Sequence, residues 1–187
     1  MSQSQARLFV LDGPAATGKS VITQRLLEEE SELSFCPRVT SRPRRPDEDE
    51  PFEYRFISEA DFDRLLEDGQ FAAYRVFLHG FSYGLPRGDL EELLSRGDVL
   101  TIVDTGTAEQ VKAQFPESVT ILVISPMEEI EKRLRALGIY GAEQIQERVQ
   151  NAGNILSLAP YYDFVVVNRQ GRLEHVLQQV RHILRTP

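Results

Sequence analysis

Residues 8–29 read LFVLDGPAATGKSVITQRLLEE, and this stretch decides the fold. The opening LFVLD is a short apolar run that predicts a buried strand, and residues 21–27 carry apolar side chains at helical spacing. Between them, GPAATGKS at residues 13–20 matches the pattern G-x-x-x-x-G-K-[ST], in the position between strand and helix that this motif requires. The stretch therefore predicts a phosphate-binding loop in an α/β core.

This loop predicts nucleotide binding because its backbone N–H groups can surround phosphate oxygens while the helix N-terminus favours negative charge. Lys19 is expected to reach the terminal phosphates, and Ser20 to hold Mg²⁺, the expected cofactor. A loop of this kind occurs in switches, motors and small-molecule kinases alike, so it does not define the reaction. The residues expected to bind the nucleotide are Gly13, Pro14, Ala15, Ala16, Thr17, Gly18, Lys19 and Ser20.

Three later apolar runs extend the core: DVLTIVD at 98–104, VTILVIS at 119–125 and DFVVVN at 163–168. Continuous runs of this length are typical of strands buried on both faces of a parallel sheet, and segments of helical periodicity separate them. The alternation predicts an α/β fold with a mostly parallel sheet flanked by helices. We expect one domain over 1–187, with a core at 1–34 and 85–187 and an inserted subdomain at 35–84, where short strands and one small helix are predicted.

Composition limits the possible partners. The formal net charge of -8 argues against a general nucleic-acid binder, which needs a basic surface. No apolar run approaches the roughly 20 residues that cross a bilayer, and the single cysteine, Cys36, excludes an intrachain disulfide and fits a reducing compartment. We expect a cytoplasmic protein, monomeric or homodimeric, without nucleic-acid or membrane partners.

Four arginines gather within eight positions of this acidic chain, in the stretch CPRVTSRPRRPDED at 36–49. Arginines presented between prolines suit bidentate capture of a phosphate group. A solvated basic turn is the alternative. The four are Arg38, Arg42, Arg44 and Arg45.

Five motifs, in order, resemble those of the guanylate kinase family. TSRPRRPDE resembles its T-T-R-x-x-R-x-G-E, EYRFIS its D-Y-x-F-V-S, FSYGLPR its N-Y-Y-G-x-P, EKRLRALG its E-x-R-L-x-x-R-G, and DFVVVN its Y-D-Y-V-V-V-N. The resemblance implies a P-loop kinase that transfers the γ-phosphoryl group of ATP to the phosphate of a nucleoside monophosphate, with GMP as the lead candidate. It also implies that the inserted region binds the acceptor and that a helical lid lies at about 135–150.

The resemblance assigns roles residue by residue. Arg42, Arg45, Tyr54 and Tyr83 would bind the acceptor phosphate, and Asp104 matches an acid of the family. Arg38, which stands where the family has a serine, is a further acceptor-binding candidate from the basic cluster. Arg133 and Arg148 would neutralise the transferring phosphoryl group, and Asn168 would lie near ATP. The catalytic candidates are then Lys19, Arg42, Arg133 and Arg148.

The sequence departs from the family where the acceptor's base would be recognised. Ala73 stands in place of a glutamate, Ile102 in place of an acid, and Leu85 in place of a small hydroxyl residue. Two alternatives therefore stay open: a kinase of another phosphorylated small molecule, such as ribose 1,5-bisphosphate, and a non-catalytic module that binds phosphorylated proteins. The second is less favoured, because such modules usually have degraded phosphate loops.

Overall fold

The structure is a computed structural model that describes residues 6–44, 52–76, 80–104 and 107–186. The chain forms two compact units. The first comprises Met1–Val10 and Ser31–Ser118, and the second comprises Leu11–Glu30 and Val119–Pro187. In the described ranges, no helix is both long and apolar enough to cross a membrane.

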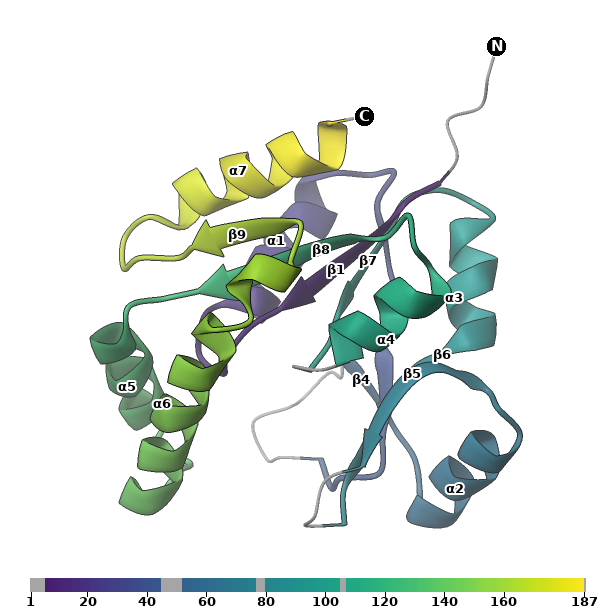
Figure 1. Cartoon of the computed structure of the whole chain (residues 1–187), viewed down its shortest axis with the longest axis horizontal. Helices are drawn as coiled ribbons and strands as arrows, with labels where there is room; N and C mark the ends of the chain where they lie inside the picture. The colour runs from purple at the N-terminus through teal and green to yellow at the C-terminus, as the bar shows by residue number, and fades with distance from the viewer. Residues whose placement is uncertain (1–5, 45–51, 77–79, 105–106, 187) are drawn as a thin grey trace. The chain divides into compact units, whose positions relative to one another are not determined.

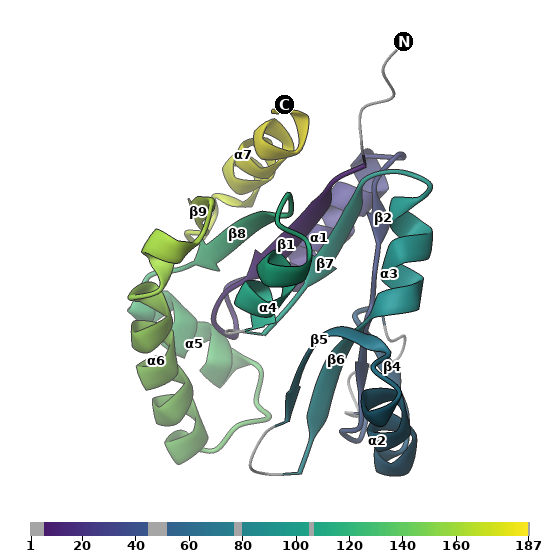
Figure 2. The ribbon, with the colours of Figure 1, turned by 45° about the vertical axis from the view of Figure 1, so that its right-hand side comes forward.

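A five-stranded sheet carries the α/β core, with strand order β2-β7-β1-β8-β9; Figure 1 labels four of these strands and Figure 2 also labels β2. Strand β2 pairs parallel with β7, and β8 pairs parallel with β9. The apolar runs in the sequence explain why these segments form interior strands, since β7 and the central part of β8 are buried throughout. The predicted α/β class with a mostly parallel sheet is confirmed. The strands are β1 (Leu8–Asp12), β2 (Ser34–Phe35), β7 (Val99–Ile102), β8 (Val119–Ile124) and β9 (Phe164–Val167).

The second unit surrounds β8 and β9 with helices. Two of these, α5 and α6, pack side by side through Ile130 and Leu134 on one and Ile145 and Ala152 on the other (Figure 2). Helix α7 has a buried apolar face with Val176, Leu177 and Val180 at helical spacing. The helices are α1 (Lys19–Glu29), α5 (Met127–Ala136), α6 (Ala142–Leu156), the short 3₁₀ helix η1 (Ala159–Tyr161) and α7 (Leu173–Arg185).

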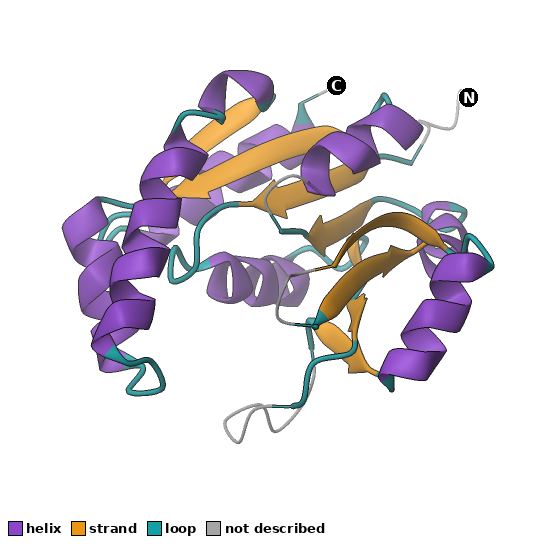
Figure 3. Ribbon diagram, turned by 60° about the horizontal axis from the view of Figure 1, so that its bottom comes forward, coloured by secondary structure: helices purple, strands orange, loops and turns teal. Residues whose placement is uncertain are grey.

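The first unit contains a four-stranded sheet with strand order β4-β3-β6-β5. Strand β3 pairs parallel with β4 and antiparallel with β6. Phe62 of α2 packs against Val39 and Phe71 of this sheet, and the Ser58 hydroxyl caps α2 by accepting from the Asp61 N–H at 3.1 Å. Figure 3 shows the strands and helices by colour. The elements are β3 (Arg38–Thr40), β4 (Tyr54–Phe56), α2 (Glu59–Glu67), β5 (Phe71–Val76), β6 (Ser82–Pro86), α3 (Arg87–Leu94) and α4 (Thr107–Gln114).

Two elements differ from the sequence-based expectation. Strand β2 is only two residues long, too short to show an alternation pattern, and was not expected as part of the core sheet. Residues 142–159 form one of the segments of helical periodicity in the sequence, but α6 ends at Leu156 and Pro160 lies in η1. Proline cannot donate the backbone hydrogen bond that would continue an α-helix. The expected bounds of the inserted region and of the lid stay predictions.

Candidate active site

The phosphate-binding loop joins β1 to α1 in the second unit. Its backbone takes positive φ angles at Gly13 (144°), Ala16 (61°) and Gly18 (92°). A Cβ atom at Gly13 would lie 2.1 Å from the carbonyl oxygen of Val123, so this position has no room for a side chain. The glycine is therefore required by both conformation and space.

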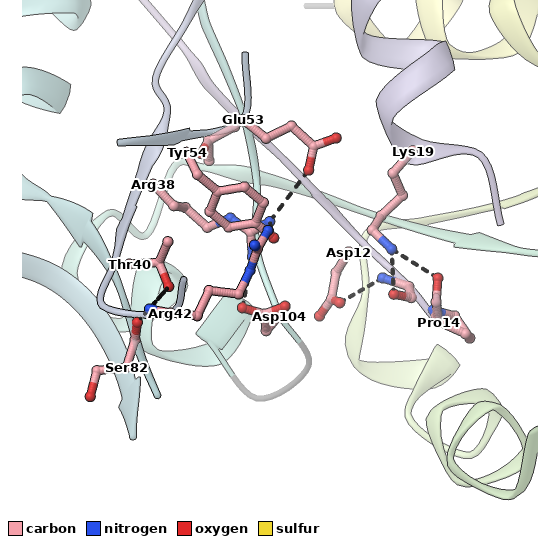
Figure 4. A network of polar contacts seen from close by, with 12 residues as sticks. Asp12, Pro14, Lys19, Arg38, Thr40, Arg42, Glu53, Tyr54, Ser82 and Asp104 are labelled. Atoms are coloured by element: carbon pink, nitrogen blue, oxygen red, sulfur yellow. Dashed lines mark hydrogen bonds and ion pairs between the residues drawn. The ribbon is translucent and has the colours of Figure 1, made fainter. Parts of the chain in front are cut away.

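Lys19 and Ser20 open α1 directly after this loop. The Lys19 ammonium donates to the carbonyl oxygens of Gly13 at 2.7 Å and Pro14 at 2.8 Å, so it lies over the loop itself (Figure 4). Ser20 is exposed on the first turn of the helix. Mg²⁺ prefers oxygen ligands and keeps several waters, and an exposed hydroxyl at this position fits such an ion.

Three side chains from later parts of the second unit hold the loop. The Asn168 side-chain amide donates to the Thr17 carbonyl at 2.8 Å, and the Arg133 guanidinium donates to the Ala16 carbonyl at 3.1 Å. The Tyr162 hydroxyl donates to the Asp12 carboxylate, which also accepts from the Gly13 N–H at 2.5 Å. The loop is thus fixed at its start and at its turn.

Asp12 and Tyr162 were not among the residues expected at the site. Asp12 is completely buried, and burial next to this carboxylate raises the pKa of the Tyr162 phenol far above its usual value. The phenol therefore stays protonated and can donate at any physiological pH. A carboxylate directly before the glycine loop, in an otherwise apolar strand, was the one signal in the sequence.

The two arginines expected to neutralise the transferring group differ in their surroundings. Arg133 also donates to the Ser125 hydroxyl at 3.0 Å and to Glu129 at 2.8 Å, so its guanidinium is built into the support of the loop. Arg148 stacks on the ring of Tyr140, with its guanidinium carbon 4.2 Å from the ring centroid. Their proposed catalytic role stays a prediction.

The arginine cluster lies in the first unit, where Arg38 is the most enclosed member. Its guanidinium donates to Asp104 at 2.7 Å and to the Tyr54 hydroxyl at 2.5 Å, and it lies over the Tyr54 ring at 4.4 Å (Figure 4). Glu53 forms a longer ion pair with it at 3.6 Å. Three residues from two other segments of the chain thus meet at one buried cation.

Arg42 lies on the same aromatic surface. Its guanidinium carbon is 4.9 Å from the centroid of the Tyr54 ring and 5.0 Å from that of Phe56. The rings of Tyr83 and Tyr54 contact each other edge-on, with their centroids 5.9 Å apart. The structure therefore brings Arg38, Arg42, Tyr54, Tyr83 and Asp104 together, whereas Arg45 lies outside the described residues.

Burial and neighbouring charges both shift the pKa values of Arg38 and Tyr54. Burial lowers the pKa of the Arg38 guanidinium, but Asp104, Tyr54 and Glu53 outweigh this and hold the pKa above its usual value. Burial raises the pKa of the Tyr54 phenol, and although Arg38 opposes this, the neighbouring carboxylates reinforce it. Arg38 is therefore charged and Tyr54 protonated at neutral pH.

The three apolar replacements seen in the sequence are part of the interior. Ala73, Leu85 and Ile102 are each 1% exposed. Ala73 and Leu85 are cross-strand partners in β5 and β6. The carboxylates next to the arginine and tyrosine cluster are therefore those of Glu53 and Asp104.

Comparison with known proteins gives a consistent result over the whole chain. The model of the guanylate kinase family matches residues 5–186. The guanylate kinase of Oceanobacillus iheyensis is 33% identical over 188 residues, covering 100% of this chain and 90% of its own. That of Sphingopyxis alaskensis is 38% identical over 164 residues, covering 86% and 74%. The crystal structure of guanylate kinase from Anaplasma phagocytophilum superposes with a TM-score of 0.76 at 27% identity, covering 98% of this chain and 86% of that one.

Together with the phosphate-binding loop, these comparisons show an ATP-dependent P-loop phosphotransferase, and the protein is an enzyme of this class. The chain belongs to the guanylate kinase family. Neither alternative from the sequence, a sugar-phosphate kinase or a non-catalytic module, is favoured by these comparisons.

Proposed function

We propose that the protein transfers the γ-phosphoryl group of ATP to the phosphate of GMP. The observation that carries this proposal is a phosphate-binding loop of complete sequence and geometry in a chain that the family model matches over residues 5–186. The named relatives are guanylate kinases, and GMP is taken from them as the acceptor.

ATP would bind to the loop of the second unit. Backbone N–H groups at the start of α1 face the phosphates in a loop of this kind, and Lys19 exchanges its bonds to the Gly13 and Pro14 carbonyls for phosphate oxygens. Ser20 would hold Mg²⁺, which neutralises phosphate charge when bound. Asn168 supports this site through Thr17.

The acceptor would bind to the first unit through its phosphate. Arg42 and Arg45 would supply positive charge, and Tyr54 and Tyr83 would supply hydroxyl donors. Arg42 is 7% exposed and lies over the rings of Tyr54 and Phe56, which reduces the conformational entropy lost when it binds an anion. An ionised phosphate acceptor needs no general base at neutral pH.

Neutralisation of the transferring group would fall to Lys19, Arg133 and Arg148. Charge spreads over the equatorial oxygens in the transition state, and fixed cations stabilise it without reorganisation. A lid at about 135–150 would exclude water. Arg148 lies within this segment, at the helix α6.

The test is ADP formation from ATP and Mg²⁺ with one acceptor at a time: GMP, dGMP, AMP, CMP, UMP, dTMP or ribose 1,5-bisphosphate. We expect turnover with GMP to exceed that with every other acceptor in the panel. Turnover with the sugar phosphate alone would overturn GMP as the acceptor. Lys19→Ala serves as the background control, because ADP formed by that variant reports contaminating activity.

A further inference from the structure

Arg38 is a buried cation whose two terminal nitrogens donate hydrogen bonds to protein groups. One terminal nitrogen donates to Asp104 at 2.7 Å and the other to the Tyr54 hydroxyl at 2.5 Å. The remaining nitrogen, Nε, is buried without a hydrogen-bond partner, and the side chain is 4% exposed. A buried polar atom left unpaired destabilises a fold, so stability alone does not explain an arginine here.

Arg38 balances the charge of two carboxylates. Glu53 and Asp104 are 18% and 32% exposed, and Arg38 is within ion-pair distance of both. Arg42 stacks on the same Tyr54 ring as Arg38. Without the Arg38 charge, an anion approaching Arg42 would be repelled by carboxylates at only partly exposed positions, where screening is weak.

Arg38 also sets the direction of the Tyr54 hydroxyl. A phenol oxygen has one hydrogen to donate and can accept at its lone pairs. Because Arg38 donates to this oxygen, the hydrogen of Tyr54 must point away from Arg38. The hydroxyl is thereby held as a donor for another group.

We infer that Arg38 is a positioning residue for the acceptor phosphate: it orients Tyr54 as a donor and cancels the charge of Asp104 and Glu53, without itself contacting the phosphate. This inference rests on the proposed function, since it takes the acceptor's phosphate to bind beside Arg42 and Tyr54. It gives Arg38 a different role from the direct acceptor contact that the sequence suggested.

The inference predicts a selective effect on acceptor binding. Arg38→Met removes the charge and the bond to Tyr54 while keeping a flexible side chain of similar length. We expect the KM for GMP to rise by about 10-fold to 100-fold, the range of a lost charge-assisted hydrogen bond. The KM for ATP and the kcat at saturating GMP should stay close to the unmodified values. Arg38→Lys, which keeps the charge, should recover part of the loss.

A double-mutant cycle separates positioning from direct contact. If Arg38 acts through the Tyr54 hydroxyl, Arg38→Met should have a clearly smaller effect on phosphate affinity in a Tyr54→Phe background. Adding Asp104→Asn to Arg38→Met should restore part of the affinity, because it removes one uncompensated carboxylate. This double variant also guards against unfolding of the single one, since it leaves no unpaired Asp104 charge. The matched control is Arg55→Met on β4, which breaks an exposed ion pair with Asp89 of α3.

Inorganic phosphate is the probe for the cycle, because it carries no base. Its affinity is measured by ³¹P NMR, and folding of each variant is checked by its Tm. An equal loss of phosphate affinity with and without the Tyr54 hydroxyl, together with no recovery on adding Asp104→Asn, would overturn the inference in favour of direct contact. A lowered Tm with unchanged phosphate affinity would overturn it in favour of a structural role. Absence of GMP turnover by the unmodified enzyme would instead count against the proposed function, and the phosphate titrations would still decide the role of Arg38.

Discussion

The proposed phosphate sites of the two units are built from different parts of the chain. In the second unit the loop uses its backbone, and its shape depends on glycines such as Gly13, whose position has no room for a Cβ atom. In the first unit, side chains carry the proposed site, and Arg38 and Arg42 are placed by stacking on Tyr54. The backbone loop therefore tolerates little substitution at a few positions. The side-chain site can change its preference for an acceptor through single substitutions.

This difference also separates generality from selectivity. Backbone N–H groups and one lysine recognise any nucleotide triphosphate tail, whereas a charge-balanced set of arginines, phenols and carboxylates can be adjusted to one acceptor. Substitutions of the loop residues that face the phosphates should therefore impair the reaction with every acceptor. Substitutions in the arginine and tyrosine cluster of the first unit should instead change the KM of the acceptor.

Lys19→Ala should have the largest effect. It removes the cation that lies over the loop, and kcat/KM should fall by about 10³-fold or more with any acceptor. The Tm should change little, because the bonds that Lys19 makes go to loop carbonyls at a partly exposed position. Steady-state ADP formation measures the loss, with Lys132→Ala on the exposed face of α5 as control. Normal turnover would show that the loop does not hold the reacting phosphate.

Gly13→Ala comes next and tests the backbone design directly. The positive φ and the contact with the Val123 carbonyl should lower the free energy of unfolding by at least ~3 kcal/mol. Urea titration measures this. Gly88→Ala, where a Cβ would meet nothing within 4 Å, is the control and should be neutral or slightly stabilising. Equal losses in both variants would contradict a steric requirement at Gly13.

Arg42→Ala tests the proposed acceptor site of the first unit. We expect the KM for GMP to rise by about 100-fold while the KM for ATP stays the same, because a charged bidentate partner of the acceptor is lost. Arg64→Ala on α2, whose side chain is 70% exposed, controls for loss of a surface arginine. A parallel rise in both KM values would mean that the two substrates are not bound independently.

Tyr162→Phe should have the smallest of these effects. It leaves the buried Asp12 carboxylate without the Tyr162 hydroxyl bond, which should cost about 1–3 kcal/mol of stability. Tyr161→Phe, at the adjacent and largely exposed tyrosine, should be neutral. The Tm of both variants is measured by thermal unfolding. An equal change in Tm would show that the Tyr162 hydroxyl does not stabilise the loop.

The phosphate loop could be predicted because its signals are contiguous. An apolar strand, a glycine pattern and a helical repeat occupy residues 8–29, and the structure has β1, the loop and α1 in that order. The supports of the loop could not be predicted in the same way. Tyr162 and Asp12 are 150 positions apart, and neither residue type indicates by itself a buried pair.

The sequence predicted which residues belong to the arginine and tyrosine cluster, but not which of them bond to each other. Tyr54 and Asp104 were named from the family resemblance and Arg38 from the basic cluster, but the bond from Arg38 to Asp104 spans 66 positions and depends on how the strands of the first unit align. An arginine in a basic cluster is more often solvated than buried. Burial of Arg38 between two acids is a tertiary effect that spacing along the chain does not carry.

The stack of Arg148 on Tyr140 offers an optical handle on the expected lid. The chain contains no tryptophan, so Tyr140→Trp would introduce a single indole fluorophore next to a guanidinium that lies 4.2 Å from the ring in the present structure. If Arg148 leaves the ring to reach the nucleotide, the emission should change with ATP concentration. Stopped-flow fluorescence would then give the rate of lid closure separately from the rate of phosphoryl transfer.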